Sequence, residues 1–321
     1  MFKSVPVLCY HKVSYVGGIT PEQFREHLEF LAYNNYTSIT ANELYDFMVY
    51  NKKIPKKSVV ITFDDCSLDN WVYAIPLLNK YGFKAIFFAI TDFIGKGSKR
   101  SQYPDNDLPN IEDATTSFVK ALRDSDTSQF MNEEELYSAV YDYEHEVYSH
   151  SARHQMCFKS LRLKGVYPEK WHWGMFGIYD EVKEGSKYYD RGSAYAYDGY
   201  WPVIQNGELI YKKRETEERY RFCLEDFTRS KKYLENLLDK PLDFFCWPWG
   251  HYDKLSMKAL QEAGYKGSFT LERFPNSYGT NPFYINRIAV GDKKDIKWLE
   301  NRLKMYSNRI TATIFFKKFK K

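Results

Sequence analysis

An apolar run that ends in two carboxylates constrains the fold of this chain more than any other feature. Val59–Phe63 consists of apolar or β-branched residues, and Asp64 and Asp65 follow it directly. A short continuous run of this kind is typical of a strand buried on both faces of a parallel sheet. The carboxyl ends of such strands are where α/β barrels place their chemistry, so both aspartates are candidate site residues. Taken alone, the pair also fits a simple cap or turn.

Strand and helix patterns alternate along the chain and predict an α/β fold with a parallel sheet. The predicted strands are residues 5–10, 58–63, 85–90, 146–149, 244–246 and 268–270, and the predicted helices are 21–34, 41–50, 71–80, 132–142, 217–239, 256–262 and 295–306. Thr20-Pro21-Glu22-Gln23 opens the first helix with a capping residue, proline at the first position and an acidic first turn. The length of 321 residues fits one domain, 1–321, with a large insertion.

Two histidines, His150 and His154, follow the predicted strand 146–149. One carboxylate and two imidazoles suffice to bind a divalent metal that keeps a position open for water, as in hydrolytic zinc sites. The second aspartate of the pair is then free to act as a base. Histidines four residues apart also occur as ordinary surface residues, so the spacing alone leaves both interpretations open.

Five segments in this order resemble polysaccharide N-deacetylases, carbohydrate esterase family 4, and are closest to the bacterial poly-N-acetylglucosamine deacetylase branch. The segments are Val5–Ser14, Ile61–Asp65, Met131–Glu135, His150–His154 and Phe245–Asp253. The resemblance covers residues 1–95, 130–155 and 220–292. It implies a distorted (β/α) barrel of the NodB-like type, commonly seven-stranded. It also implies hydrolysis of an N-acetyl group on an amino sugar with one divalent metal, for which zinc ranks ahead of iron, cobalt, nickel or manganese.

The same resemblance implies roles for single residues. The metal ligands would be Asp65, His150 and His154. Asp64 would be the general base, which has to stay off the metal to remain basic.

Three further positions match site residues of the family. Trp249 matches the aromatic residue whose backbone N–H helps to hold the oxyanion, and His11 matches a position that lines the site. Arg287 matches a late arginine of the poly-N-acetylglucosamine branch. It would either pair with Asp64 or be a surface cation.

The chain departs from the family pattern at three places. Cys66 follows the aspartate pair where glycine is usual, so we expect a thiol near the metal and sensitivity to oxidation. Cys246 stands where many members carry the arginine that steadies the base. No histidine occurs after residue 270, so the late Leu-x-His motif that supplies the general acid is missing. The candidates for the acid are His11, His251 and His172.

Residues 156–219 lie outside the resemblance and form a large aromatic-rich insertion. The segments 171–177 and 195–201 are rich in tryptophan, tyrosine and glycine, a composition unlike that of disordered chains. We interpret the insertion as a lid or substrate-binding element; a structural flap or an oligomer contact are the alternatives.

Charge and cysteine content narrow the remaining functions. The formal net charge of +4 comes without a basic stripe before the last residues, so no nucleic-acid partner is expected. The five cysteines are odd in number and never spaced C-x-x-C, which predicts reduced thiols. Met1–Ser4 leads straight into the first predicted strand without a leader pattern, so we expect a cytoplasmic location. A cytoplasmic enzyme would act on a sugar precursor or a lipid-linked glycan.

The final residues, 314–321, alternate aromatic residues and lysines. A solvated tail is one interpretation, and peripheral contact with an anionic inner membrane surface is the other. Two further functions also stay open at the level of sequence. One is hydrolysis of a small-metabolite amide or formamide on the same fold, and the other is a catalytically decayed module that only binds sugar.

Overall fold

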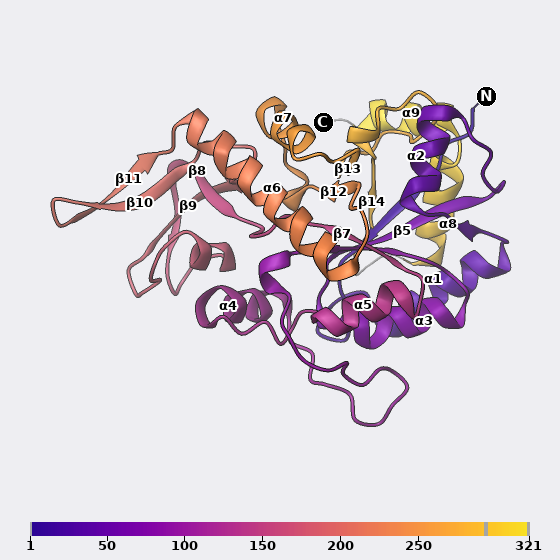
Figure 1. Cartoon of the computed structure of the whole chain (residues 1–321), viewed down its shortest axis with the longest axis horizontal. Helices are drawn as coiled ribbons and strands as arrows, with labels where there is room; N and C mark the ends of the chain where they lie inside the picture. Colours follow the sequence, from indigo (N-terminus) through magenta and orange to yellow (C-terminus); the bar gives the residue numbers. More distant parts are fainter. Residues whose placement is uncertain (1, 292–294, 320–321) are drawn as a thin grey trace.

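A parallel sheet of seven strands, in the order β13-β12-β7-β6-β5-β1-β14, forms the centre of the protein (Figure 1). The computed structural model describes residues 2–291 and 295–319. The strands are β1 (Val7–Tyr10), β5 (Ser58–Asp65), β6 (Ile86–Ala89), β7 (Glu146–Ser149), β12 (Phe244–Cys246), β13 (Gly267–Phe269) and β14 (Ile288–Ala289). The predicted parallel sheet is therefore confirmed, and its strands are fully buried except at a few ends, as their apolar composition requires.

The sheet curves into a barrel that is closed by a single bridge between its two edges. Each pair of neighbours along the seven-strand order is parallel. The two edge strands approach each other where Phe269 forms a single parallel bridge with Ile285, three residues before β14. A short strand, β4 (Thr37–Ser38), adds to β5, and β2 (Val13–Ser14) and β3 (Gly17–Gly18) form a separate hairpin. This geometry matches the predicted distorted barrel.

Helices connect the strands and cover the barrel. They are α1 (Pro21–Tyr33), α2 (Ala41–Tyr50), α3 (Ile75–Lys80), α5 (Glu133–Tyr141), α6 (Thr216–Leu238), α7 (Lys254–Glu262) and α8 (Ile296–Tyr306). Thr20 begins α1 with a reciprocal capping box to Gln23, as its sequence predicts. The predicted helix 71–80 is only partly regular, because its first turn, Asn70–Ala74, is π-helical. Short turns of 3-10 helix occur at Thr91–Phe93, Trp173–Gly177, Pro248–Gly250 and Pro282–Tyr284.

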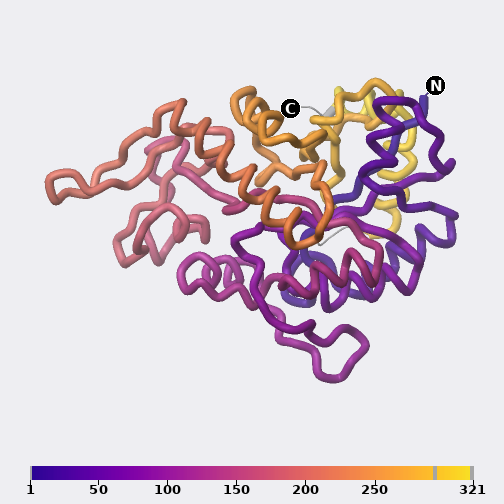
Figure 2. The backbone as a smooth tube through the Cα atoms, viewed as in Figure 1, coloured from indigo at the N-terminus to yellow at the C-terminus, as the bar shows by residue number. Residues whose placement is uncertain are grey.

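The insertion builds a second, antiparallel sheet that projects from one end of the molecule (Figure 1). Its strands, in the order β11-β10-β8-β9, are β8 (Met156–Val166), β9 (Lys187–Ser193), β10 (Tyr200–Gln205) and β11 (Glu208–Lys213). The sheet has its own small core, which includes Phe158, Met175 and Tyr189. It ends at Lys213, so residues 216–219 belong to the first turn of α6. The backbone trace runs from this sheet through α6 straight back to the barrel (Figure 2).

Buried contacts fasten the insertion to the barrel. Arg219 of α6 is buried and donates to Asp198 of the insertion and to Asp253, the N-cap of α7, both at 2.8 Å. On the other side, Trp173 stacks on Phe118 of α4 (Ala114–Asp124) with ring centres 4.0 Å apart. The insertion therefore touches the rest of the fold at more than one place.

The predicted tail is a helix over its described length, α9 (Arg309–Phe319), and Lys320 and Lys321 lie outside the described residues. Phe315 packs against Tyr306 of α8 and Phe316 against Phe274. The interpretation of 314–321 as a solvated tail is therefore wrong for its described part, because Phe315 and Phe316 have partners in the fold. Within the described residues, no helix combines the length and the apolar character needed to cross a membrane.

Candidate active site and metal centre

Strand register brings the predicted site residues to one edge of the sheet. Asp65, the last residue of β5, pairs with Ala89 of β6, and Ala89 pairs with Ser149 of β7. His150 is the next residue after Ser149, so it emerges at the same edge as the two aspartates. The carboxyl ends of neighbouring parallel strands thus converge, as the apolar run before Asp64 predicts.

Asp65, His150 and His154 form a compact set of ligand atoms, all within 4.8 Å of one another. Asp65 Oδ1 lies 3.5 Å from His150 Nε2 and 3.8 Å from His154 Nε2. The two imidazoles are buried, and their ring centres are 4.9 Å apart. The three predicted metal ligands are therefore neighbours in space.

Burial keeps both imidazoles in the form that binds metals. It lowers the pKa of His150, and burial followed by the charge of His150 lowers the pKa of His154 further. His150 Nδ1 lies 3.0 Å from the carbonyl oxygen of Cys246, which fixes Nδ1 as the donor and leaves the lone pair of Nε2 facing Asp65. His154 Nδ1 has no hydrogen-bond partner among the described residues.

These residues fit a bound divalent cation. Asp65 Oδ1 is buried without a hydrogen-bond donor in the described part of the chain, and it faces two unprotonated imidazole nitrogens. Burial raises the pKa of Asp65, and this effect exceeds the opposing effects of His11 and His150. Three lone-pair atoms directed at one point repel one another unless a cation lies between them. A carboxylate with two histidines is a common ligand set of hydrolytic zinc sites.

Asp64 lies beside this cluster, and Arg287 holds it. The guanidinium makes two parallel hydrogen bonds to the carboxylate, 2.5 Å from Nη1 to Oδ1 and 2.9 Å from Nη2 to Oδ2. Both side chains are buried, so of the two alternatives Arg287 pairs with Asp64 and is not a surface cation. Burial raises the pKa of Asp64, but the charges of Arg287, His150 and His11 together outweigh burial and hold this pKa below its ordinary value. Asp64 is therefore ionised at neutral pH.

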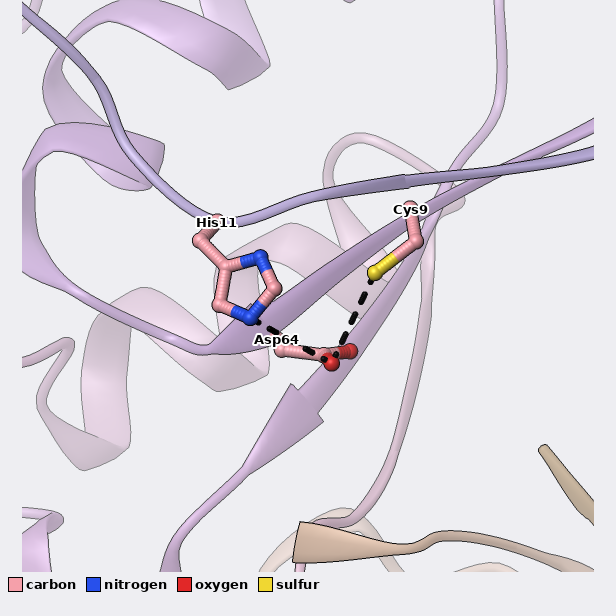
Figure 3. Close-up of side chains that lie close together, drawn as sticks. All are labelled: Cys9, His11 and Asp64. Carbon is pink, nitrogen blue, oxygen red and sulfur yellow. Dashed lines mark hydrogen bonds and ion pairs between the residues drawn. The ribbon is translucent and has the colours of Figure 1, made fainter. Parts of the chain in front are cut away.

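Two thiols complete the surroundings of Asp64. Cys9 Sγ lies 3.7 Å from Asp64 Oδ2, and Cys246 Sγ lies 3.6 Å from Oδ1 (Figure 3 shows Cys9). Sequence reasoning named Cys246 only as a missing arginine and did not consider Cys9. The alternation along β1 was a usable signal, because Cys9 lies two residues before His11 and pairs with Thr62 of β5.

Cys66 does not behave as its position in the sequence suggests. Its backbone has a φ of +50°, so the turn does tolerate a side chain there. Its thiol is buried in the hydrophobic core, and burial raises its pKa well above the ordinary value. A buried thiol of raised pKa is a poor nucleophile, which argues against the expected oxidation sensitivity.

Trp249 covers the second histidine. Its ring centre lies 4.8 Å from that of His154 and 5.1 Å from that of Trp173, with which it is stacked. Its backbone has a φ of +62°, an unusual conformation for a bulky residue. Trp173 comes from the insertion, so the insertion contributes directly to the wall of the site, a contribution that the motifs did not assign.

The three candidate acids lie at different places. His11 Nε2 is 3.7 Å from Asp64 Oδ2, and its ring is about half exposed (Figure 3). The ring centre of His172 lies 5.6 Å from that of Trp249. Burial, followed by the charge of Arg191, lowers the pKa of His172 to about 4. The ring of His251 is instead in edge contact with Tyr197. The geometry therefore favours His11 as the proton donor nearest the base.

A buried network holds the loop that carries both histidines. Asp226 of α6 accepts a hydrogen bond from the backbone N–H of Ala152 at 2.8 Å and from the hydroxyl of Tyr195 at 3.2 Å. The Tyr195 hydroxyl also contacts Ser151 Oγ at 3.0 Å, and Ser151 Oγ accepts from the backbone N–H of His154 at 2.9 Å. Tyr195 belongs to the insertion, so the insertion also supports the loop that carries the two predicted metal-binding histidines.

Comparison with protein families and relatives adds independent findings. A family model described as polysaccharide deacetylase matches residues 51–268. The poly-beta-1,6-N-acetyl-D-glucosamine N-deacetylase of Staphylococcus aureus strain MRSA252 is 22% identical over 278 residues, which are 85% of this chain and 68% of that protein. YxkH of Bacillus subtilis is 38% identical over 93 residues, which are 28% of this chain. The match thus spans only 33% of the length of YxkH.

Solved structures share the fold. A de-N-acetylase from Aggregatibacter actinomycetemcomitans has a TM-score of 0.63 at 18% identity, over 93% of this chain and 99% of that one. IcaB from Ammonifex degensii has a TM-score of 0.59 at 19% identity, over 94% of this chain and 96% of that one. At these identities the likeness establishes a common fold and no more.

Proposed function

The chain belongs to the polysaccharide deacetylase family, and we propose that it is a metal-dependent hydrolase that removes N-acetyl groups from an amino sugar in a saccharide or lipid-linked glycan. The observation that carries this proposal is the convergence of Asp65, His150 and His154 beside an ionised Asp64. Asp65, His150 and His154 would hold one divalent ion, zinc by preference. When bound, such an ion lowers the pKa of water and polarises a carbonyl.

Within this proposal the chain's own groups divide the proton transfers. Asp64 takes a proton from the attacking water, and its ion pair with Arg287 keeps it ionised and correctly oriented. His11, on the open side of Asp64, donates a proton to the leaving amine. Burial lowers the pKa of His11, but the interactions of His11 with Cys9, Asp64 and Asp65 outweigh burial and raise this pKa to about 10. His11 is therefore protonated, as an acid has to be, at neutral pH.

Acetate release and metal analysis test the proposal together. The protein, loaded with zinc, is incubated with an oligomer of N-acetylglucosamine, its lipid-linked form and a panel of small amides and formamides. We expect the wild type to release acetate from the saccharides and the Asp64→Asn variant to release none. Turnover confined to the small amides would favour the alternative hydrolase. Glycan binding and metal content without any turnover would favour the decayed sugar-binding module.

We further propose that α9 makes a peripheral contact with an anionic membrane. The residues that would make this contact differ from the alternating phenylalanines and lysines considered in the sequence. Ile310 and Ile314 are 46% and 61% exposed, and the exposed Phe2 lies beside them at a surface hollow that Arg309 and Lys317 also line. Apolar side chains with flanking cations suit an anionic lipid surface. The cytoplasmic location itself stays a prediction, which cell fractionation would test.

Vesicle sedimentation tests this contact. We expect the intact protein to sediment with anionic vesicles at low salt and to be released by salt. An Ile310→Ser/Ile314→Ser variant, which leaves the packing of Phe315 intact, should sediment less. Equal sedimentation of the two proteins would remove this support for a lipid-linked substrate.

A further inference from the structure

The β8–β9 ribbon of the insertion carries an excess of positive charge next to the site. Its two strands contain five cationic residues and a single carboxylate, that of Asp190. The cationic residues are Lys159, Arg162, Lys164, Lys187 and Arg191. The family motifs assign no function to these five residues, because they lie wholly within the insertion.

Arg191 is the one of these five residues that contacts an aromatic ring of the site. Its guanidinium carbon lies 5.9 Å from the ring centre of Trp249, and the ring of Trp249 also contacts that of His154. Arg191 is exposed, and no carboxylate among the described residues pairs with it. An arginine packed on an aromatic ring is already ordered, so it loses little conformational freedom when it binds an anion.

Three of the other cations are only partly neutralised. Lys159, Arg162 and Lys164 share the one carboxylate of Asp190 at distances of 3.7, 3.5 and 4.0 Å. A single negative charge cannot balance three positive charges. Asp190 precedes Arg191 in β9, so these three cations gather on the other side of the strand from Arg191. Arg191 is therefore the cation of the ribbon that faces the site.

We propose that Arg191 binds an acidic group, a carboxylate or phosphate, of a glycan whose N-acetylated sugar occupies the site. The guanidinium of Arg191 presents a planar pair of donors that matches both anions. Arg191 and His154 both contact the ring of Trp249, so the acidic group would belong to a position adjacent to the N-acetylated sugar. This inference rests on the proposed function and narrows it to acidic glycans.

Kinetics on matched substrates test the inference. The substrates are a neutral oligomer of N-acetylglucosamine, an oligosaccharide that alternates N-acetylhexosamine with hexuronic acid, and the neutral oligomer with a diphosphate at its reducing end. We expect a lower KM for at least one acidic substrate, and a KM that rises with salt. The second and third substrates distinguish an acid within the repeating unit from the diphosphate of a lipid-linked headgroup.

Arg191→Gln should raise the KM for the acidic substrate about fivefold, the upper range for an exposed ion pair, with kcat and the neutral KM unchanged. Arg191→Lys should recover part of the loss. The control is Lys56→Gln, an exposed cation in the loop before β5 and therefore at the opposite end of the strands from the site. It should change neither KM.

Binding measured in the Asp64→Asn background separates the inference from the proposed function. Preferential binding of an acidic glycan that Arg191→Gln abolishes, with no acetate from any substrate in the wild type, supports this inference and overturns the proposed function. Release of acetate from neutral and acidic substrates with equal KM, unaffected by Arg191→Gln, overturns this inference and leaves the proposed function standing.

Discussion

Replacing Arg287 by methionine tests the central ion pair. Methionine keeps much of the length of the side chain but removes the charge and both hydrogen bonds to Asp64, which are 2.5 and 2.9 Å long. It also removes the bond from Nε to the carbonyl of Thr270 at 3.0 Å. Because the Arg287 side chain is 0% exposed and that of Asp64 3%, no water replaces the lost donors. Breaking a buried pair in this way costs about 3–5 kcal/mol in the free energy of unfolding.

The loss of unfolding free energy in Arg287→Met should depend on pH, and the protonation of Asp64 determines the direction of this dependence. In the wild type the pKa of this carboxyl is held below its ordinary value, so the pair contributes stability above pH 4, about the pKa of the unfolded chain. This stability is lost only as the pH falls through the lower folded-state pKa. In Arg287→Met the effect of burial dominates and raises the pKa of Asp64, so the carboxyl takes up a proton in the folded state. The difference between the two proteins should therefore be largest at pH 7 and shrink towards pH 4.

Urea unfolding at pH 7, 5.5 and 4.5 measures this difference. The double variant Asp64→Asn/Arg287→Met is the control, since it removes the stranded charge, and it should be more stable at pH 7 than Arg287→Met alone. If Arg287→Met costs less than about 1 kcal/mol at pH 7, or costs the same at all three values, the buried pair does not set the ionisation of Asp64. The acid limb of the activity profile should also move to higher pH in Arg287→Met.

Three further changes probe the rest of the site. Alanine at each of the three proposed metal ligands should reduce bound metal from about one ion per chain towards none, whereas Asp64→Asn should retain the metal and lose most turnover. Full metal occupancy in all three alanine variants, measured by elemental analysis, would contradict the assignment of these residues as ligands. Tyr195→Phe, which removes only the hydroxyl of the buried network, should weaken metal affinity about tenfold, and unchanged affinity in a competition titration would show that the network does not position the ligand loop. Trp173→Ala should raise KM for saccharides severalfold at constant metal content, because stacked aromatic faces are worth about 1 kcal/mol beyond their area, and an unchanged KM would limit the insertion to a structural role.

Features with local physical causes were predictable from the sequence. The strand before Asp64 was recognisable because burial on both faces demands a continuous apolar run. The start of α5 was also recognisable, since Asn132 and Glu135 form a capping box that is written in four consecutive residues. Together with the resemblance, these signals placed Asp65, His150 and His154 correctly next to one another. The convergence of these residues was thus predicted from short segments that end at one edge of the sheet.

Features that depend on tertiary contacts were not predictable in the same way. The strands of the insertion lack a recognisable sequence pattern. The pairing of β8 with β9 shifts register three times between Phe158 and Gly165, which breaks the alternation that identifies a strand. The partner of Arg287 lies 223 residues away, so the sequence left its pairing open. Helix α9 looked like a tail because the rings that hold Phe315 and Phe316 belong to other elements.

Backbone strain is concentrated where the proposed chemistry lies. Eleven non-glycine residues of the described chain have positive φ, and five of them surround the site, namely Asp65, Cys66, Ser151, His154 and Trp249. Each such conformation costs free energy, of the order of 1 kcal/mol or more, and it persists only when surrounding contacts determine it. Here those contacts include the hydrogen bond from the backbone of His154 to Ser151, which the insertion supports through Tyr195. A module that had lost catalysis would gain stability by relaxing these turns, so their retention together with the ligand set favours a working metal site over a decayed one.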